Sequence, residues 1–298
     1  MGKQILFRGV GTAMVTPMRE DGTINYPVFG QLLREQADRG ADAVIIAGTT
    51  GEGSTLYDRE HIELVEYAVK KINGKIPVIA GAGSNNTAHA VHLSKEFEKI
   101  GADGLLHVTP YYNKASQQGL FLHFQACAEA TRLPIILYNV PSRTGVNIYP
   151  ATYKRLSQID NIVACKEASG NFSQLAKIAA LCKEDLTIYS GNDDQVVPLL
   201  ALGGKGVISV VSNVKPELVH NCCKAFFDGD TAKARQLQLE MLPLADALFC
   251  EVNPIPVKYA MNVLGWEAGE CRLPLVEPSE AHKEYIEKAL RAEGLITE

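Results

Sequence analysis

Residues 104–138 read GLLHVTPYYNKASQQGLFLHFQACAEATRLPIILY, and this stretch shows the unit from which most of the chain is built. The apolar run Gly104–Val108 stops at a threonine and a proline, and Gln117–Thr131 then has apolar residues at helical spacing. A second short apolar run, Ile135–Tyr138, follows. Two short apolar runs separated by a helical segment predict a β-α-β unit with parallel strands.

The same alternation of a short apolar run and a longer helical segment recurs along the chain. Eight runs rich in Val, Ile and Ala are expected to form strands that are covered on both faces. These strands are predicted at Gly11–Thr16, Ala43–Ala47, Val78–Ala80, Gly104–Val108, Ile135–Tyr138, Ile162–Lys166, Thr187–Ser190 and Gly206–Ser209. Helices are predicted at Pro27–Gly40, Asp58–Ile72, Thr87–Ile100, Gln117–Thr131, Pro150–Gln158, Phe172–Cys182, Gln195–Leu202 and Pro216–Phe227.

Eight strand–helix units in succession predict the α/β class and, more specifically, a (β/α)8 TIM barrel. An open, doubly wound parallel sheet is the alternative, because alternation along the chain does not show whether the sheet closes. After Gly229 three helical segments follow with no strand between them, at Asp230–Cys250, Pro254–Leu264 and Glu280–Glu293. The 298 residues are therefore expected to divide into a catalytic barrel at residues 1–229 and a C-terminal helical appendage at residues 230–298.

Composition narrows the classes of function. Lys and Arg number 29 against 34 Asp and Glu, and the net charge of −5 argues against a broad surface for nucleic acid or anionic membrane. The seven cysteines form no Cys-x-x-Cys pair, so neither a disulfide framework nor a zinc knuckle is expected, and a reducing cytoplasm is predicted. The sequence has no secretory signal and no run of about 18 apolar residues, so no membrane span is expected.

The C-terminal ends of the strands carry the active site of a TIM barrel, which directs attention to Lys166. Strand alternation predicts that Ile162, Ala164 and Lys166 share one face. If that face lines the barrel interior, burial lowers the pKa of the amine, and a neutral amine attacks a ketone to form a Schiff base. A lysine that leaves the strand into solvent, or that pairs with Glu167, is the alternative.

Other strand ends carry polar groups that suit small carboxylic acids. Tyr138 ends the neighbouring strand, and its phenol could transfer protons or be an ordinary core tyrosine. Arg143 follows in a short loop, where it could bind a carboxylate through two hydrogen bonds or lie on the surface. The turn Gly48–Gly53 could hold a carboxylate on backbone N–H groups, or be an ordinary turn.

Two further patterns are assigned to structure rather than to function. His89 and His92 lie three residues apart on a predicted helix, with no third ligand nearby in the sequence, so no metal site is expected. The run Gly203–Gly206 looks like a phosphate loop but precedes the eighth strand. It is therefore expected at the end of the barrel opposite the active site.

Four blocks at strand ends carry a resemblance to a known family. They are Gly48-Thr49-Thr50-Gly51-Glu52, Val108-Thr109-Pro110-Tyr111-Tyr112-Asn113, Tyr138-Asn139-Val140-Pro141-Ser142-Arg143-Thr144-Gly145 and Lys166-Glu167-Ala168-Ser169-Gly170. Together they resemble the dihydrodipicolinate synthase family, within the pyruvate-dependent Schiff-base aldolases and lyases. The resemblance covers essentially the whole chain, and the arginine of the third block fits this family better than its N-acetylneuraminate lyase relatives.

The resemblance implies a lyase-type synthase that condenses pyruvate with L-aspartate 4-semialdehyde. The product would be 4-hydroxy-tetrahydrodipicolinate, in the first committed step of diaminopimelate and L-lysine biosynthesis. It also implies that Lys166 forms the Schiff base and that Tyr138 relays protons with Thr49 and Tyr112. Tyr112 would reach in from the adjacent subunit, in a homotetramer built as a dimer of dimers.

The resemblance further implies how the two substrates are held. Thr49 and Thr50 would bind the pyruvate carboxylate, Arg143 would bind the carboxylate of the semialdehyde, and main-chain carbonyls of Gly191 and Ile208 would line the pocket. None of the steps needs a metal, flavin or nicotinamide cofactor.

The resemblance also implies a possible inhibitory site for L-lysine at a dimer interface. Its residues would be Ser54, His61, Asn85, His89 and Tyr111, although sensitive relatives carry an acid where this chain has His89.

Two other functions stay open at this point. One is a Schiff-base aldolase for a longer keto acid, against which Arg143 argues because a polyol chain prefers hydroxyl partners. The other is a non-catalytic sensor of small acids built on the barrel. The presence of Lys166, Tyr138 and Tyr112 together argues against a sensor, because binding alone does not require a nucleophile.

Overall fold

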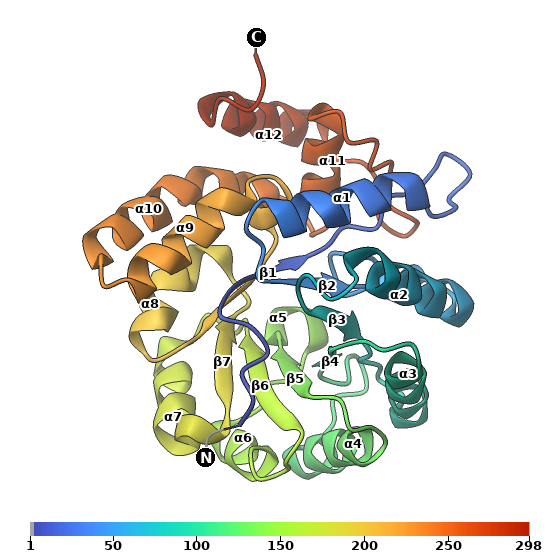
Figure 1. Ribbon diagram of the computed structural model, residues 1–298, viewed down its shortest axis with the longest axis vertical. Helices are drawn as coiled ribbons and strands as arrows, with labels where there is room; N and C mark the ends of the chain where they lie inside the picture. Colours follow the sequence, from blue (N-terminus) through green and yellow to red (C-terminus); the bar gives the residue numbers. More distant parts are fainter. Residues whose placement is uncertain (1–2, 298) are drawn as a thin grey trace.

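The computed structural model describes residues 3–297 and contains a closed barrel of eight parallel strands (Figure 1). Each strand pairs with the next one in the sequence, and β8 pairs with β1 to close the ring. This closure confirms the predicted TIM barrel and rules out the open sheet. The strands are β1 (Gly9–Ala13), β2 (Ala43–Ile46), β3 (Val78–Gly81), β4 (Gly104–Val108), β5 (Ile135–Asn139), β6 (Ile162–Glu167), β7 (Thr187–Ser190) and β8 (Gly206–Ser209).

Helices alternate with the strands and form the ring around the barrel in Figure 1. The first strand departs most from expectation, since Met14–Thr16 lie beyond its end. There the N–H of Val15 donates to Asn213 Oδ1 at 3.2 Å, so a side chain replaces a sheet partner. The helices are α1 (Tyr26–Asp38), α2 (Asp58–Ile72), α3 (Thr87–Lys99), α4 (Gln117–Glu129), α6 (Pro150–Leu156), α7 (Phe172–Cys182), α8 (Val196–Ala201) and α9 (Pro216–Phe227).

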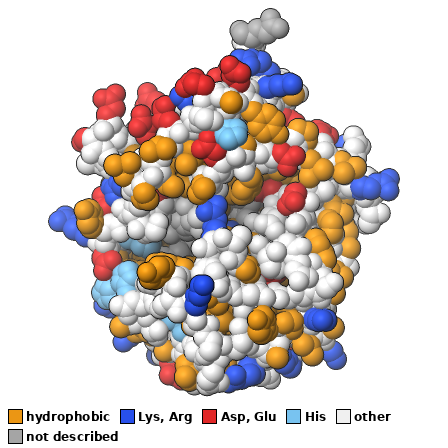
Figure 2. Space-filling view, turned by 180° about the vertical axis from the view of Figure 1, so that it is seen from behind, with side chains coloured by type: hydrophobic (Ala, Val, Ile, Leu, Met, Phe, Trp, Pro, Cys, Tyr) orange, Lys and Arg blue, Asp and Glu red, His pale blue; other side chains and the backbone are white. Residues whose placement is uncertain are grey.

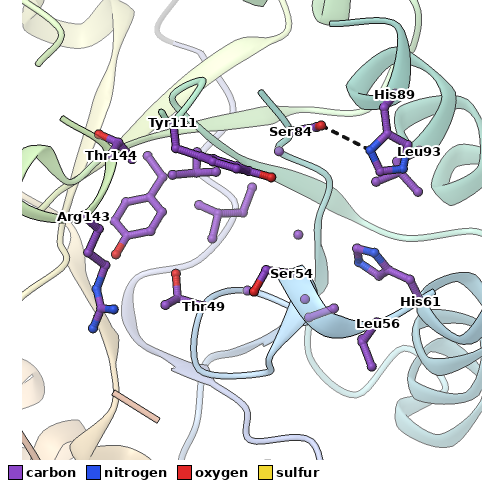
Figure 3. Close-up of a pocket in the computed structure, with 18 of the residues that line it drawn as sticks. Thr49, Ser54, Leu56, His61, Ser84, His89, Leu93, Tyr111, Arg143 and Thr144 are labelled. Carbon is purple, nitrogen blue, oxygen red and sulfur yellow. Dashed lines mark hydrogen bonds between the residues drawn. The ribbon is translucent and has the colours of Figure 1, made fainter. Parts of the chain in front are cut away.

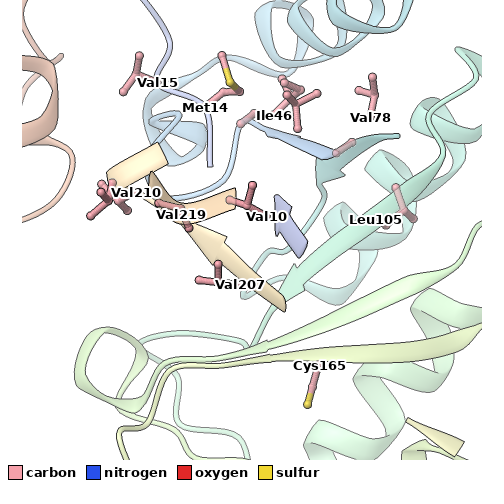
Figure 4. Packing of buried hydrophobic residues seen from close by; sticks show 14 of the residues in the cluster. Val10, Met14, Val15, Ile46, Val78, Leu105, Cys165, Val207, Val210 and Val219 are labelled. Carbon is pink, nitrogen blue, oxygen red and sulfur yellow. The ribbon is translucent and has the colours of Figure 1, made fainter. Parts of the chain in front are cut away.

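Apolar side chains pack in two layers, one inside the barrel and one between the strands and the helices. Figure 4 shows the second layer, in which Val10, Val207 and Cys165 are buried. Inside the barrel, the ring of Phe7 stacks on Tyr189 with 4.2 Å between the ring centroids. Because Phe7 precedes β1, this stack fills the end of the barrel opposite the strand C-termini, and the open end is left for chemistry.

The prediction that Ile162 shares a face with Ala164 and Lys166 is wrong. Ile162 packs in the outer layer, whereas Ala164 belongs to the interior cluster. The pairing register with β5 shifts by one residue at this point, because Ile135 pairs with Ile162 but Ile136 pairs with Ala164. The extra residue, Val163, makes an irregularity of the bulge type that restores the inward direction for Lys166.

The C-terminal residues form three helices, α10 (Thr231–Leu248), α11 (Ile255–Val263) and α12 (Glu280–Ala292). Helix α10 packs along α9, and α12 contacts both α10 and α11. Figure 1 shows α11 and α12 at one side of the barrel, beyond α1. The division at residue 229 stays a prediction.

Among the described residues, no helix is both long and apolar enough to span a membrane, and all seven cysteines are free thiols.

Candidate active site

Lys166 lies near the C-terminal end of β6, with 6% of its surface exposed. Its Nζ makes no hydrogen bond or ion pair with any residue between 3 and 297. Burial lowers the pKa of the amine from 10.5 to about 7, an effect that the charge of Asp193 opposes and that of Arg143 reinforces. At pH 7 about half of such amines are neutral, compared with roughly one in three thousand at the ordinary pKa. The barrel therefore presents a nucleophilic amine.

Tyr138 on β5 pairs with Lys166 on the neighbouring strand β6, as the order of the strands in the sequence predicted. The Lys166 Nζ lies 4.3 Å from the centroid of the Tyr138 ring. Burial raises the pKa of the phenol, while the charge of Arg143 and a hydrogen bond with Thr49 lower it. Tyr138 is therefore a protonated phenol at neutral pH, with a hydroxyl partner in Thr49 through which a proton can pass.

Asp193 is a buried carboxylate whose charge acts on the same amine, and no role was predicted for it. It follows β7, and its side chain is fixed by Ser209 Oγ at 2.5 Å and by the N–H groups of Val210 at 2.9 Å and Val211 at 3.3 Å. Burial raises the pKa of Asp193, and these hydrogen bonds oppose the rise. Its place at a strand end was the one signal in the sequence that could have drawn attention to it.

The alternative in which Lys166 pairs with Glu167 does not occur. The Glu167 carboxylate instead accepts hydrogen bonds from Asn139 Nδ2 at 3.1 Å, from the Tyr153 hydroxyl at 3.2 Å and from the Ser169 N–H at 2.9 Å. Adjacent residues of a strand point to opposite faces, so the carboxylate and the amine are separated by the sheet.

Arg143 lies in a one-turn helix, α5 (Pro141–Thr144), and not in the irregular loop that was expected. The turn forms because Pro141 occupies a first-turn position and Gly145 ends it with a φ of 71°. Arg143 is exposed to solvent and lines the same cavity as Tyr138 and Thr49. Its guanidinium is therefore available to a carboxylate at the barrel mouth.

The glycine-rich turn between β2 and α2 holds Thr49 and Thr50. A Cβ at Gly53 would lie 2.2 Å from the Ala47 carbonyl oxygen, so the close approach of backbone to backbone requires glycine. Thr50 is buried, with 2% of its surface exposed, whereas Thr49 is open to the cavity. The two residues thus differ in exposure, and Thr49 is the one that lines the cavity.

Gly191 and Ile208 lie at the ends of the next two strands. A Cβ at Gly191 would lie 3.0 Å from Cε of Lys166 and 2.7 Å from Cβ of Ala168, so glycine makes room for the lysine stem. Ile208 is fully buried in the interior cluster that includes Tyr138. Gly191 thus lies beside Lys166, and Ile208 packs in the same cluster as Tyr138, while the pocket role of their carbonyls stays a prediction.

Tyr112 does not join these groups within one chain. It is 88% exposed, has a φ of 74°, and its N–H donates to the Thr144 carbonyl at 3.3 Å. A large aromatic side chain held away from its own barrel is available to another molecule. Within one chain Tyr112 therefore lies apart from Tyr138 and Thr49, and the expected relay of these three residues stays a prediction.

A cavity of about 350 Å³ extends from the barrel mouth along the ends of β2, β3 and β4 (Figure 3). One part is lined by Thr49, Tyr138 and Arg143. Seen from behind the view of Figure 1, the surface is hollowed near its centre, with Lys or Arg side chains at the edge (Figure 2). The other part of the cavity is lined by four of the five residues of the candidate lysine site: Ser54, His61, His89 and Tyr111.

The candidate lysine site contains a carboxylate, that of Asp58, which is not among the residues that the resemblance implies. Nε2 of His89 lies 2.9 Å from Asp58 Oδ1, and Nδ1 lies 3.2 Å from Ser84 Oγ. Asn85 joins the group by donating to the Tyr111 carbonyl at 3.2 Å. Burial lowers the pKa of His61 to about 4, so this ring is neutral, and its Nε2 has no partner among the described residues.

Comparison with known proteins identifies the family. Residues 6–293 match the model of the dihydrodipicolinate synthetase family. The chain belongs to this family. It is 52% identical to a 4-hydroxy-tetrahydrodipicolinate synthase of Acetivibrio thermocellus, over 98% of this chain and 99% of the relative. This similarity confirms the resemblance.

Solved structures of relatives share the fold over nearly the whole length. The dihydrodipicolinate synthase of Cyanidioschyzon merolae with lysine bound has a TM-score of 0.96 and 42% identity, over 98% of this chain and all of that one. The chloride-inhibited enzyme of Acinetobacter baumannii complexed with pyruvate has a TM-score of 0.95 and 39% identity, over 97% of this chain and 99% of that one.

Between residues 3 and 297, no group of three or more His, Cys, Asp or Glu side chains is arranged to hold a metal ion. His89, one of the two histidines considered as a metal pair, contacts Asp58 and Ser84 instead.

Proposed function

We propose that the chain condenses pyruvate with L-aspartate 4-semialdehyde to give 4-hydroxy-tetrahydrodipicolinate, with Lys166 as the nucleophile. The observation that carries the proposal is the buried amine of Lys166, which lies against the Tyr138 ring, has no ion-pair partner in residues 3–297 and has a pKa lowered to about 7. Its relatives named as synthases, one of them solved with pyruvate, support the same reaction.

The first half of the reaction activates pyruvate. The Lys166 amine attacks the ketone carbon, and loss of water gives an iminium in which nitrogen carries the positive charge. That charge makes the neighbouring methyl group acidic, so a proton leaves and an enamine forms. Tyr138 is placed to deliver and remove the protons of the carbinolamine stage, in exchange with the Thr49 hydroxyl.

The second half forms the new carbon–carbon bond and the ring. The enamine carbon attacks the aldehyde carbon, and the aldehyde oxygen takes up a proton. The amino group of the second substrate then attacks the iminium carbon, which closes the ring and releases the Lys166 amine. We assign Arg143 to the carboxylate of the semialdehyde, because its exposed guanidinium lines the cavity beside Tyr138.

We infer that the active protein is a homotetramer, a dimer of dimers, in the cytoplasm. The argument for a dimer is Tyr112, whose 88% exposed side chain can complete the relay only in another subunit. The argument for a reducing compartment is the set of seven free cysteines. Sedimentation of the purified chain tests the assembly, and a monomer with full activity would contradict the role of Tyr112.

The experiment that tests the activity compares second substrates. With pyruvate present, the chain should consume L-aspartate 4-semialdehyde and form no product with N-acetylmannosamine. The R143A variant should raise the KM for the semialdehyde by about tenfold or more while leaving the KM for pyruvate nearly unchanged. Turnover of N-acetylmannosamine instead would indicate the aldolase alternative.

L-Lysine binding is a second proposal, supported by the Asp58 carboxylate at the candidate site. Although His89 itself suits an ammonium group poorly, Asp58 lies 2.9 Å from it and can offer the negative charge. A titration of L-lysine into the steady-state assay should lower the rate, and the D58N variant should need a higher concentration. An unchanged wild-type rate at millimolar lysine would contradict this proposal.

A further inference from the structure

The segment that follows α10 reaches back to the barrel mouth and contacts the turn that carries Thr50. Asn253 Nδ2 donates to Thr50 Oγ1 at 3.0 Å, across 203 residues of sequence. Asn253 is buried, with 5% of its surface exposed, and its Oδ1 has no partner among the described residues. The contact with Thr50 is thus the one hydrogen bond of this side chain within the described chain.

The direction of this hydrogen bond decides what the Thr50 hydroxyl can do. A hydroxyl has one proton to donate and lone pairs to accept with. When Oγ1 accepts from Asn253, its proton stays free, and within residues 3–297 no acceptor takes it. A carboxylate can only accept hydrogen bonds, so a hydroxyl polarised in this way is matched to it.

The same C-terminal segment fixes the rest of the turn through Glu52. Glu52 is buried with a left-handed backbone φ of 56°, and its Oε1 pairs with Lys258 Nζ at 2.7 Å. Its Oε2 accepts from the Arg272 N–H at 2.8 Å. On the barrel side, Thr16 Oγ1 donates to the Gly51 carbonyl at 2.7 Å. The turn is therefore held between the barrel and residues of the C-terminal segment.

We propose that Asn253 is a positioning residue for pyruvate, which orients the Thr50 hydroxyl so that its proton is donated to the pyruvate carboxylate. This inference rests on the proposed function, with Thr50 at the pyruvate carboxylate as the family resemblance implies, and it gives the C-terminal segment a part in substrate binding. Asn253 acts through Thr50 and does not itself touch the reacting atoms.

The test measures the pyruvate concentration that gives half-maximal trapping of Lys166 by borohydride, together with steady-state constants. In N253A the hydroxyl is free to rotate, and the half-saturating concentration and the KM for pyruvate should rise about tenfold. The kcat and the KM for the semialdehyde should stay within about threefold, because the amine and Arg143 are unchanged.

Two further variants keep the test decisive. N253D has nearly the same shape, but its carboxylate accepts the Thr50 proton and adds a negative charge, so the pyruvate KM should rise by about a hundredfold. N262A is the matched control. Asn262 exchanges hydrogen bonds with Gly269 in the same segment but does not contact the Thr50 turn, so its pyruvate KM should be that of the wild type.

The possible outcomes separate this inference from the proposed function. If wild-type Lys166 forms no adduct with pyruvate, the proposed function fails and the inference falls with it. If the adduct forms, but N253A and N253D saturate at the wild-type concentration, only the inference is overturned. Equal rises in N253A and N262A would likewise overturn it, since they would indicate a general loosening of the segment.

Discussion

Two buried lysines show how the same side chain serves opposite purposes in this barrel. Lys166 in β6 is 6% exposed, and its amine has no ion-pair partner within the described residues. Lys258 in α11 is 1% exposed, and its amine pairs with Glu52 at 2.7 Å and donates to the Glu270 carbonyl at 2.7 Å. The first is an amine that burial pushes toward the neutral form, and the second is an amine held by a carboxylate and a main-chain carbonyl.

If Lys166 is the nucleophile that we propose, the difference teaches that pairing, and not depth, separates a reactive lysine from a structural one. Burial without a partner disfavours the charged form and leaves a lone pair for attack on a carbonyl. At Lys258 the carboxylate of Glu52 and the carbonyl of Glu270 hold the amine, and the pair with Glu52 links the C-terminal segment to the Thr50 turn.

The largest effect is expected from Lys166→Met. Without the amine no Schiff base forms, so kcat/KM should fall by about 10⁴-fold or more. The free energy of unfolding should stay equal to that of the wild type or rise, because the variant removes a buried amine that has no ion-pair partner among the described residues. Steady-state assays and denaturant unfolding measure the two effects. A variant with residual activity within tenfold of the wild type would contradict the role of Lys166.

Lys258→Met should instead lower the stability of the protein. It leaves the Glu52 carboxylate buried without its cation, so the free energy of unfolding should fall by about 3–5 kcal/mol. Guanidinium unfolding measures this loss. The matched control is Lys224→Met, which breaks an exposed pair with Asp228 and should change stability by about 0–1 kcal/mol. A loss of less than about 1 kcal/mol in Lys258→Met would remove the contrast between the two lysines.

The pH dependence of kcat/KM distinguishes the amine of Lys166 from the paired amine of Lys258. Because the pKa of Lys166 is lowered to about 7, kcat/KM for pyruvate should fall about tenfold per pH unit below that value, as the amine gains a proton. A flat profile from pH 5 to 7 would contradict a reactive amine with this pKa.

The same pKa has a consequence for stability. Between about pH 7 and 10.5 the unfolded chain binds a proton at Lys166 that the folded chain does not. The wild type should therefore gain stability relative to Lys166→Met as the pH rises through this window, and the difference should be constant below pH 7. Parallel unfolding curves of the two proteins at several pH values give the measurement.

The smallest effect is expected from Asp193→Asn. The negative charge of Asp193 raises the pKa of Lys166, so its removal should lower that pKa and move the acid limb of kcat/KM to lower pH. At pH 8, where the amine is already mostly neutral, the rate should change by less than about tenfold. A shift of the acid limb to higher pH would contradict the expectation that the Asp193 charge raises the pKa of Lys166.

The sequence sufficed to predict the parts of the molecule that depend on local pattern. The barrel follows from the repeated apolar runs, and the neighbouring positions of Lys166 and Tyr138 follow from the order of parallel strands. The bulge at Val163 could not be predicted, because alternation alone carries no information about an extra residue in a strand. Asn253 was missed for a different reason. Its partner Thr50 lies 203 residues away, and no local pattern connects them.

Reduction of the protein–pyruvate mixture with borohydride, followed by peptide mass mapping, tests the central claim most directly. The account predicts an N6-(1-carboxyethyl) adduct on Lys166, no such adduct on Lys258, and no adduct without pyruvate. Absence of the adduct from Lys166, or an equal yield on the two lysines, would contradict the claim that an unpaired buried amine in β6 carries the chemistry.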